Sequence, residues 1–171
     1  MSARLPDTAV DDVTPNPVYG MPGHLIRRCH QIAVALFLEE CAGFGITPQQ
    51  YATLRILASN DGVDQITLAG LAAFNRTTAG EIIGRMESAG LLKRRDGRID
   101  RRVRNIHITA AGRKRLAAVE AAVARVQERI LRPLDRTERR RFIEYLARIA
   151  SENNEHSRAP LRPPGRTRVG A

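Results

Sequence analysis

An arginine-rich segment between two apolar stretches limits the possible folds of this chain more than any other feature. The segment LLKRRDGRIDRRVRNIHIT, residues 91–109, is apolar at both ends and has Asp96-Gly97, a strong hairpin turn signal, in its middle. Seven basic and two acidic residues lie between Lys93 and Arg104. A thin hairpin with this charge cannot build its own core, but it can enter a groove of nucleic acid and neutralise phosphates. The segment therefore predicts a basic two-stranded hairpin that contacts a polyanion.

The residues just before this hairpin predict two helices separated by a short turn. Thr67, with Ile66 and Leu71 as a hydrophobic staple, is the expected N-cap of a short packing helix over 68–74. A longer helix follows and ends at Gly90, a glycine placed for a C-terminal cap. A helix-turn-helix followed by a basic hairpin is a winged helix, which indicates DNA as the partner.

Helical periodicity continues on both sides of the winged helix. Thr47 and Asp135 each start a predicted helix with a capping box. Between them, a narrow apolar seam that includes Val123 is typical of a helix that packs against another helix, here at a dimer interface. The expected fold is mainly α with a small β-hairpin wing, in the order α-α-α-α-β-β-α-α. The predicted parts are an extended N-terminal arm over 1–21, a helical dimerisation region over 22–45 and 110–152, a winged helix-turn-helix DNA-binding domain over 46–109, and a disordered basic tail over 153–171.

Composition agrees with one DNA-binding domain that has short tails. The chain has 171 residues and a formal net charge of +10, which favours a polyanionic partner. Two cysteines are too few for a disulfide framework or a four-cysteine zinc site, and no zinc-finger spacing is present. No stretch approaches the length of a membrane span, and the acidic N-terminus lacks the apolar core of a secretory signal. We therefore expect a cytoplasmic protein that needs no metal and no cofactor.

The expected DNA contacts lie at the start of the second helix of the helix-turn-helix and near the hairpin tip. Hydroxyls and backbone N–H groups at a helix start suit phosphate oxygens, and arginine reads guanine. Gly80 would let the helix backbone approach the wall of the groove. An arginine at the hairpin tip can enter a narrow minor groove. Asp100 would hold Arg102 in one rotamer. The plainer alternatives are helix capping for the threonines and a solvated charged turn for the hairpin. The candidate DNA-binding residues are Arg76, Thr77, Thr78, Gly80, Arg85, Arg98, Asp100, Arg101 and Arg102.

Three segments together resemble the MarR family of transcriptional regulators. They are GITPQQYATLRIL, ITLAGLAAFNRTTAGEIIGRMESAGLLKRR and RIDRRVRNIHITAAGRKRL, and the resemblance covers about 22–152. Its most specific parts are Asp100 with Arg102 and the following Ile108, Thr109 and Gly112. The resemblance implies a homodimer built from the first and the last two helices, with two winged helices on an inverted-repeat operator. It also implies repression that a small ligand relieves.

The first predicted helix carries a further resemblance that concerns the effector. PGHLIRRCHQIAVALF is similar to members that control aromatic-acid catabolism, including hydroxycinnamate regulators, some of which respond to a CoA thioester such as p-coumaroyl-CoA. A carboxylate or a CoA phosphate needs cationic partners, and an aryl group needs an apolar wall. Solvated arginines and ordinary core residues are the alternative interpretation. The candidate ligand-binding residues are His24, Arg27, Arg28, Phe37, Tyr51 and Leu54.

Other functions for the chain rest on its cysteines. Family peroxide sensors have a reactive cysteine early in the first helix, close to the position of Cys29, and neighbouring cations would favour its thiolate. Those sensors have a tyrosine where this chain has Thr47, which favours Cys29 as a small buried hydrophobe. A thiol enzyme using Cys29 or Cys41 with His30 or His107 is disfavoured. Adjacent helical residues such as Cys29 and His30 point about 100° apart, and no phosphate-binding loop, metal spacing or nucleophile elbow appears. We expect no enzyme. A winged helix used only for protein contacts is the remaining alternative, and it would lack the steep salt dependence of phosphate binding.

Overall fold

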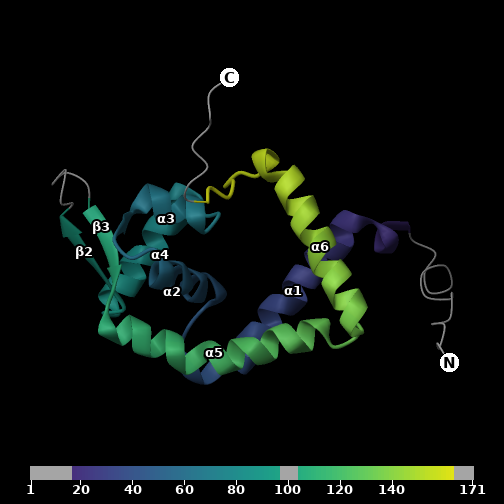
Figure 1. Ribbon diagram of the computed structural model, residues 1–171, viewed down its shortest axis with the longest axis horizontal. Helices are drawn as coiled ribbons and strands as arrows, with labels where there is room; N and C mark the ends of the chain where they lie inside the picture. The colour runs from purple at the N-terminus through teal and green to yellow at the C-terminus, as the bar shows by residue number, and fades with distance from the viewer. Residues whose placement is uncertain (1–16, 97–103, 164–171) are drawn as a thin grey trace.

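The computed structural model describes residues 17–96 and 104–163 and shows a mainly helical chain with one small sheet (Figure 1). The α-helices are α1 (Pro22–Glu40), α2 (Pro48–Ser59), α3 (Gln65–Leu71), α4 (Arg76–Ser88), α5 (Ala110–Leu131) and α6 (Arg136–Glu152). The strands are β1 (Val63–Asp64), β2 (Leu92–Asp96) and β3 (Arg104–Ile108), and short 3₁₀ turns cover Pro17–Gly20, Ala42–Phe44 and Asn154–His156. The predicted winged-helix fold class is confirmed. Within the described ranges, no helix combines the length and apolar character needed to cross a bilayer.

The sheet has one strand more than the sequence predicts. Its order is β1-β3-β2 and both pairings are antiparallel. The hairpin pairs Leu92 with Ile108 and Asp96 with Arg104, as expected for a wing that turns after Asp96. Strand β1 pairs Val63 with Ile106. Because β1 has two residues, it carries no alternation that could reveal it in the sequence.

Local capping residues fix several helix ends as expected. The Oγ1 of Thr47 accepts a hydrogen bond from the Gln50 N–H at 3.2 Å, and the Gln50 side chain accepts one from the Thr47 N–H at 3.0 Å. Asp135 and Glu138 form the same reciprocal box at the start of α6. At the end of α4, Gly90 has a φ of +70° and the Leu91 N–H donates to the Met86 carbonyl at 2.9 Å, which completes a Schellman cap.

The start of helix α3 differs from the prediction. The helix begins at Gln65 because Asp64 is its N-cap, with Oδ1 accepting from the N–H groups of Ile66 and Thr67 at 2.8 and 3.0 Å. Ile66 lies inside the first turn and is 68% exposed, so it is no staple. Both Asp64 and Thr67 are good N-cap residue types, and the structure uses the earlier one.

One apolar core connects the winged helix to helix α5. Leu54, Leu57, Ile83, Met86 and Ile106 are buried at its centre. The buried side of α5 continues this core toward α1, against which α5 packs. Val123 lies in this buried side with 6% exposure, so it is a core residue of the protomer, and its expected place on a dimer interface was wrong. An apolar seam on a helix does not tell whether its partner belongs to the same chain.

Helices α1 and α6 expose most of their apolar side chains. Phe37 is the one buried residue of α1, and α6 has none. On α6, Ile143, Leu146 and Ile149 are 54%, 41% and 50% exposed. At its start α6 is tied to α5, because Arg139 donates to Glu128 at 2.7 Å and to the Leu134 carbonyl at 2.9 Å. The rest of its apolar face has no cover within the described chain.

The two terminal segments contain more structure than predicted. Within the expected N-terminal arm, Pro17–Gly20 form a 3₁₀ turn, and residues 1–16 lie outside the described residues. The expected disorder over 153–171 was wrong for its first part, because 153–163 continue from α6 through a 3₁₀ turn and return to helix α3. Residues 164–171 lie outside the described residues. Hydrogen bonds between Asn154 and Leu161 and between Arg162 and Glu155 fix the path of this segment despite its prolines and arginines.

Candidate DNA-binding site

Helix α4 presents one buried face and one open face. Its N-cap is Asn75, whose side chain accepts a hydrogen bond from the Thr78 N–H at 2.8 Å. Ala79, Ile82, Ile83 and Met86 form the buried face. The helical repeat places Thr77, Glu81, Gly84 and Ser88 on the opposite side. A Cβ built on Gly84 would meet no atom within 4 Å, so this side is free for a large ligand to approach.

The predicted contacts on α4 fall into two groups. Arg76, Thr77 and Arg85 are exposed and lie on or beside the open face. Thr78 is half-buried and its N–H is used by the helix cap. A Cβ on Gly80 would lie 3.2 Å from the side-chain nitrogen of Gln65, so this glycine lies beside the start of α3. Its approach to DNA stays a prediction, and Gly84 is a second glycine that leaves the open face clear.

The two strands of the wing divide their charges between two faces. Alternation and pairing place Leu92 and Arg94 on the face of Ile106, toward the core. Arg94 pairs with Glu87 of α4, with Nη1 and Oε2 2.6 Å apart, and its N–H donates to the same carboxylate at 3.3 Å. Arg95 lies on the other face and is exposed. The Glu87–Arg94 pair thus holds the wing against the last turn of α4.

A groove runs between the start of α3, the start of α4 and the wing. Its lining residues are Asp64, Gln65, Ile66, Thr67, Arg76, Arg94 and Arg104. Partial burial raises the pKa of Asp64, but its hydrogen bonds with Thr67 and Ile66 outweigh this effect and the pKa is lowered. The groove adds Gln65, Thr67 and Arg104 to the candidate contacts. The sequence analysis missed them because it placed the start of α3 too late and weighed the hairpin tip above its base.

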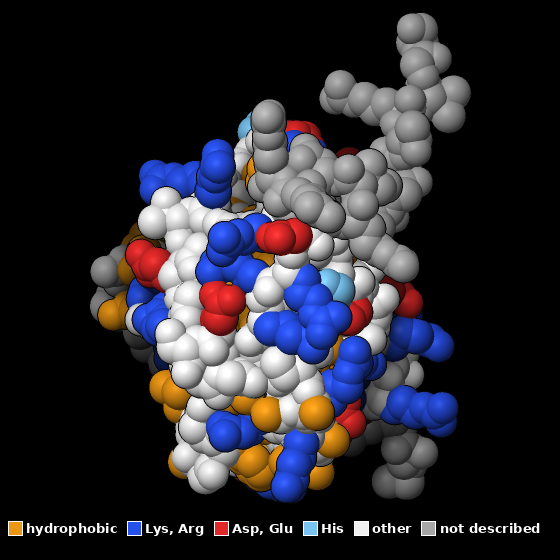
Figure 2. All heavy atoms as spheres, turned by 90° about the vertical axis from the view of Figure 1, so that its left-hand side faces the viewer, with side chains coloured by type: hydrophobic (Ala, Val, Ile, Leu, Met, Phe, Trp, Pro, Cys, Tyr) orange, Lys and Arg blue, Asp and Glu red, His pale blue; other side chains and the backbone are white. Residues whose placement is uncertain are grey.

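The wing side of the molecule is predominantly basic. Figure 2 shows this side, with Lys and Arg side chains spread over it and fewer acidic groups between them. The exposed cations of α4 and the two wing strands are Arg76, Arg85, Lys93, Arg95 and Arg104. Such a surface attracts a polyanion and steers its approach. The predicted contacts Arg98, Asp100, Arg101 and Arg102 lie outside the described residues.

Asp61 anchors the base of the wing from the loop after α2. Its Oδ1 accepts from the Ile108 N–H at 2.8 Å, and its Oδ2 lies 3.1 Å from His107 Nδ1. Partial burial raises the pKa of Asp61, but the His107 and Ile108 hydrogen bonds outweigh it and hold the pKa below its usual range. Gly62 has a φ of +84°, and a Cβ there would lie 2.8 Å from the His107 ring. The Asp61 carboxylate therefore fixes the end of β3, and Gly62 leaves the space that the His107 ring occupies.

Thr109 and Gly112 join the wing to helix α5. The Thr109 hydroxyl donates toward the carbonyls of Gly90 and Leu91, at 2.7 and 3.0 Å, and accepts from the Gly112 N–H at 3.0 Å. A Cβ on Gly112 would lie 2.3 Å from the Leu91 carbonyl oxygen. This contact gives the physical reason for a glycine three residues after the threonine.

The candidate effector residues lie at two separate ends of helix α1. His24 Nδ1 is 3.5 Å from an Arg27 nitrogen, and Arg28 is exposed nearby. Phe37 packs against Tyr51, with ring centroids 6.1 Å apart. The rise of an α-helix places Phe37 about 20 Å from His24. Leu54 and Phe37 are 0% and 5% exposed, so both belong to the core, and their contact with a ligand stays a prediction.

The two cysteines differ in environment. Cys29 is exposed in the single chain, so its expected burial was wrong. Cys41 is buried, and burial followed by the charge of Glu40 raises the pKa of its thiol.

Comparisons with known proteins agree with this geometry. The MarR family model matches residues 46–103. The transcriptional regulator HosA of Escherichia coli O157:H7 is 31% identical over 126 residues, which cover 74% of this chain and 92% of HosA. The chain belongs to the MarR family. It is therefore a transcriptional regulator.

Solved structures of one repressor resemble this MarR-family chain over most of its length. The transcriptional repressor CouR bound to a 23-mer DNA duplex has a TM-score of 0.76 and 27% identity, and the match covers 81% of this chain and 99% of CouR. CouR bound to p-coumaroyl-CoA has a TM-score of 0.75 and 25% identity, with coverage of 82% and 99%. A probable transcriptional regulator from Pseudomonas aeruginosa has a TM-score of 0.75 and 30% identity, with coverage of 77% and 98%.

Proposed function

We propose that this MarR-family regulator is a homodimeric repressor of aromatic-acid catabolic genes. One observation carries the proposal. The open face of α4 and the exposed cations of the wing lie on one side of a chain that is similar to a repressor solved on duplex DNA. In this proposal Arg76, Thr77 and Arg85 enter the major groove, and Arg98, Arg101 and Arg102 of the wing contact the backbone or minor groove. Asp100 orients Arg102.

The homodimer is part of the proposal because of the uncovered apolar faces. Leu25, Ile26 and Ile32 of α1 and the apolar side of α6 are exposed in the single chain. Exposed apolar surface of this extent marks an interaction site. A two-fold dimer built on these helices would place two winged helices on an inverted repeat, with half-sites about one helical turn apart.

We propose an aryl-CoA thioester as the effector in preference to the free acid. CouR, which is similar over most of its length, was solved with p-coumaroyl-CoA. The cationic group of His24, Arg27 and Arg28 suits phosphates, and the apolar Phe37–Tyr51 pair suits an aryl group. The two groups lie about 20 Å apart along α1, a span that matches a long thioester better than a small aromatic acid.

Fluorescence anisotropy on labelled DNA from upstream of the gene tests the proposal. The complex is challenged with p-coumaroyl-CoA, with p-coumarate and with CoA alone. Release by the thioester alone is expected. An Arg27→Gln and Arg28→Gln double variant should bind DNA normally and need more thioester for release, whereas the control Arg132→Gln should behave as wild type. A complex that ignores all three compounds would refute the effector assignment and leave DNA binding intact.

Redox sensing is a second candidate function for Cys29, whose thiol is exposed in the single chain on the side of α1 that the proposed homodimer would cover. Arg28 and His30 are its neighbours in the sequence. Peroxide should then release DNA from the wild type and leave the Cys29→Ser complex bound. Equal responses of the two proteins to peroxide would exclude Cys29 as the sensor.

A further inference from the structure

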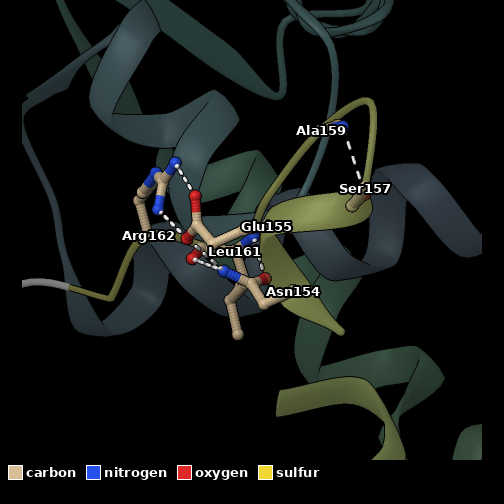
Figure 3. Close-up of polar contacts among 6 residues, drawn as sticks. All are labelled: Asn154, Glu155, Ser157, Ala159, Leu161 and Arg162. Atoms are coloured by element: carbon tan, nitrogen blue, oxygen red, sulfur yellow. Dashed lines mark hydrogen bonds and ion pairs between the residues drawn. The ribbon is translucent and has the colours of Figure 1, made fainter. Parts of the chain in front are cut away.

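The segment that follows helix α6 returns to the DNA-binding part of the molecule. We call residues 153–163 the strap. It contains the 3₁₀ turn Asn154–His156 and an extended stretch that reaches helix α3 (Figures 1 and 3). The match to the family model ends at residue 103, well before this segment.

Side-chain bonds within the strap fix its path. Asn154 Oδ1 accepts from the Leu161 N–H at 2.8 Å, and Asn154 Nδ2 donates to the Leu161 carbonyl at 3.2 Å. Arg162 donates to both carboxylate oxygens of Glu155, at 2.5 and 3.0 Å. Figure 3 shows that these bonds close the strap into a loop in which Arg162 turns back over Glu155. A two-bond arginine–carboxylate pair is directional and orients both groups.

The strap docks on the C-terminal turn of α3. The Arg162 N–H donates to the Gly70 carbonyl at 2.8 Å. That carbonyl lies in the last turn of the helix, where the bond from the residue four positions on is missing, and it also accepts from the Ala73 N–H at 3.3 Å. A Cβ on Gly70 would lie 2.9 Å from the Arg162 Cβ, so the backbones meet only because residue 70 has no side chain.

The docked strap gives the winged helix a second attachment to the dimerisation helices. The first attachment is α5, which begins directly after β3. Helix α6 is tied to α5 at its start through Arg139, and its far end leads into the strap. In Figure 1 the chain therefore closes a ring from α5 through α6 back to α3. A winged helix held at two points rotates less freely than one held at α5 alone.

We propose that the strap positions the winged helix relative to the dimerisation helices, with Gly70 and Arg162 as positioning residues for operator binding. The inference rests on the proposed binding of two winged helices to one operator. Two half-sites are bound together only if the two winged helices are held at their spacing, so a loosened strap lowers affinity for the full operator. One winged helix bound to a single half-site needs no such spacing.

Gly70→Ala and Arg162→Pro test the inference in the full-length protein. The alanine introduces the colliding Cβ, and the proline removes the N–H that reaches Gly70. Gly43→Ala is the matched control, because a Cβ there meets nothing within 4 Å. Hydrogen exchange measures strap docking. The peptide over 157–163 is compared between wild type, Gly70→Ala and the control, and exchange at the end of α3 is compared in all variants. Anisotropy measures affinity for a full operator and for a duplex with one half-site.

Both strap variants should lose protection and bind the full operator roughly three- to tenfold more weakly, the effect of one hydrogen bond and its packing, with half-site affinity unchanged. Equal losses on both duplexes, tighter binding, or unchanged binding with a released strap would each overturn the inference. Unchanged protection in both variants would overturn the docking itself. A wild type without preference for the operator would instead refute the proposed function.

Discussion

The winged helix and the helices α1 and α6 bury their apolar residues in opposite ways. In the winged helix, Leu54, Leu57 and Ile83 are at most 1% exposed. In α6 no residue is buried, and every residue is either half-buried or exposed. Of the large apolar side chains exposed in the described ranges, Ile66 alone lies within the winged helix.

This difference separates two sources of stability. The winged helix is stabilised by contacts within one chain, which are independent of protein concentration. The apolar face of α6 gains stability only when something covers it, and for the proposed homodimer that gain depends on concentration. Four substitutions separate stability within one chain from stability that depends on assembly, and they are ordered by decreasing effect.

Leu54→Ala should have the largest effect. Removal of a fully buried leucine side chain costs about 2–5 kcal/mol of the free energy of unfolding. Because Leu54 packs inside one chain, the loss in urea denaturation should be similar at low and at high protein concentration. A loss that disappears at high concentration would place Leu54 at a subunit interface.

Leu146→Glu should act on assembly and leave the winged helix folded. A charge on the apolar face of α6 should weaken the dimer by about 2 kcal/mol or more, the scale of a central interface residue. Sedimentation at micromolar protein measures the shift to monomer. The control Arg140→Glu, on the polar side of α6, should remain dimeric. A fully dimeric Leu146→Glu protein would remove α6 from the interface.

Arg85→Ala should lower operator affinity roughly tenfold, as expected for one well-placed arginine contact to a base. Arg85 is exposed and points away from the buried face of α4, so stability should change little. Anisotropy with operator and with scrambled DNA measures the loss. Arg132→Ala, at the far end of α5, is the control. Equal losses for both variants would reduce the role of Arg85 to general charge.

Asp61→Asn should have the smallest effect, through pH-dependent stability. The lowered pKa of Asp61 means that its ionised form stabilises the fold above the unfolded-state pKa and that this contribution is lost as the pH falls through the folded-state value. The variant should be about 1 kcal/mol less stable at pH 7, a modest figure because the group is partly exposed. The difference should shrink below about pH 4. A constant difference from pH 7 to 3.5 would show that the charge plays no part.

Local signals in the sequence predict much of this fold. The capping boxes at Thr47 and Asp135 and the glycine cap at Gly90 depend on residues three to five apart, and all three are confirmed. The start of α3 was misplaced because Asp64 and Thr67 are both good caps, and only the packed structure selects one. Strand β1 was missed because it forms only when β3 is beside it.

Contacts between distant segments explain the remaining differences. Nothing near Arg162 in the sequence indicates that its N–H reaches Gly70, and a proline-rich composition predicts disorder there. The sequence likewise does not show that Gly80 lies beside Gln65 of α3, because that neighbour comes from another helix. The residues proposed for DNA binding were predicted from position and charge, since a helix start and a basic hairpin are local features.

A footprint of the full-length protein on its upstream DNA, repeated over a series of salt concentrations, tests the central claim most directly. We expect two protected half-sites whose centres lie about 10 base pairs apart, and an affinity that falls steeply with salt. A chain that protects no sequence, or that protects one with little dependence on salt, would contradict the assignment of α4 and the wing as an operator-binding surface.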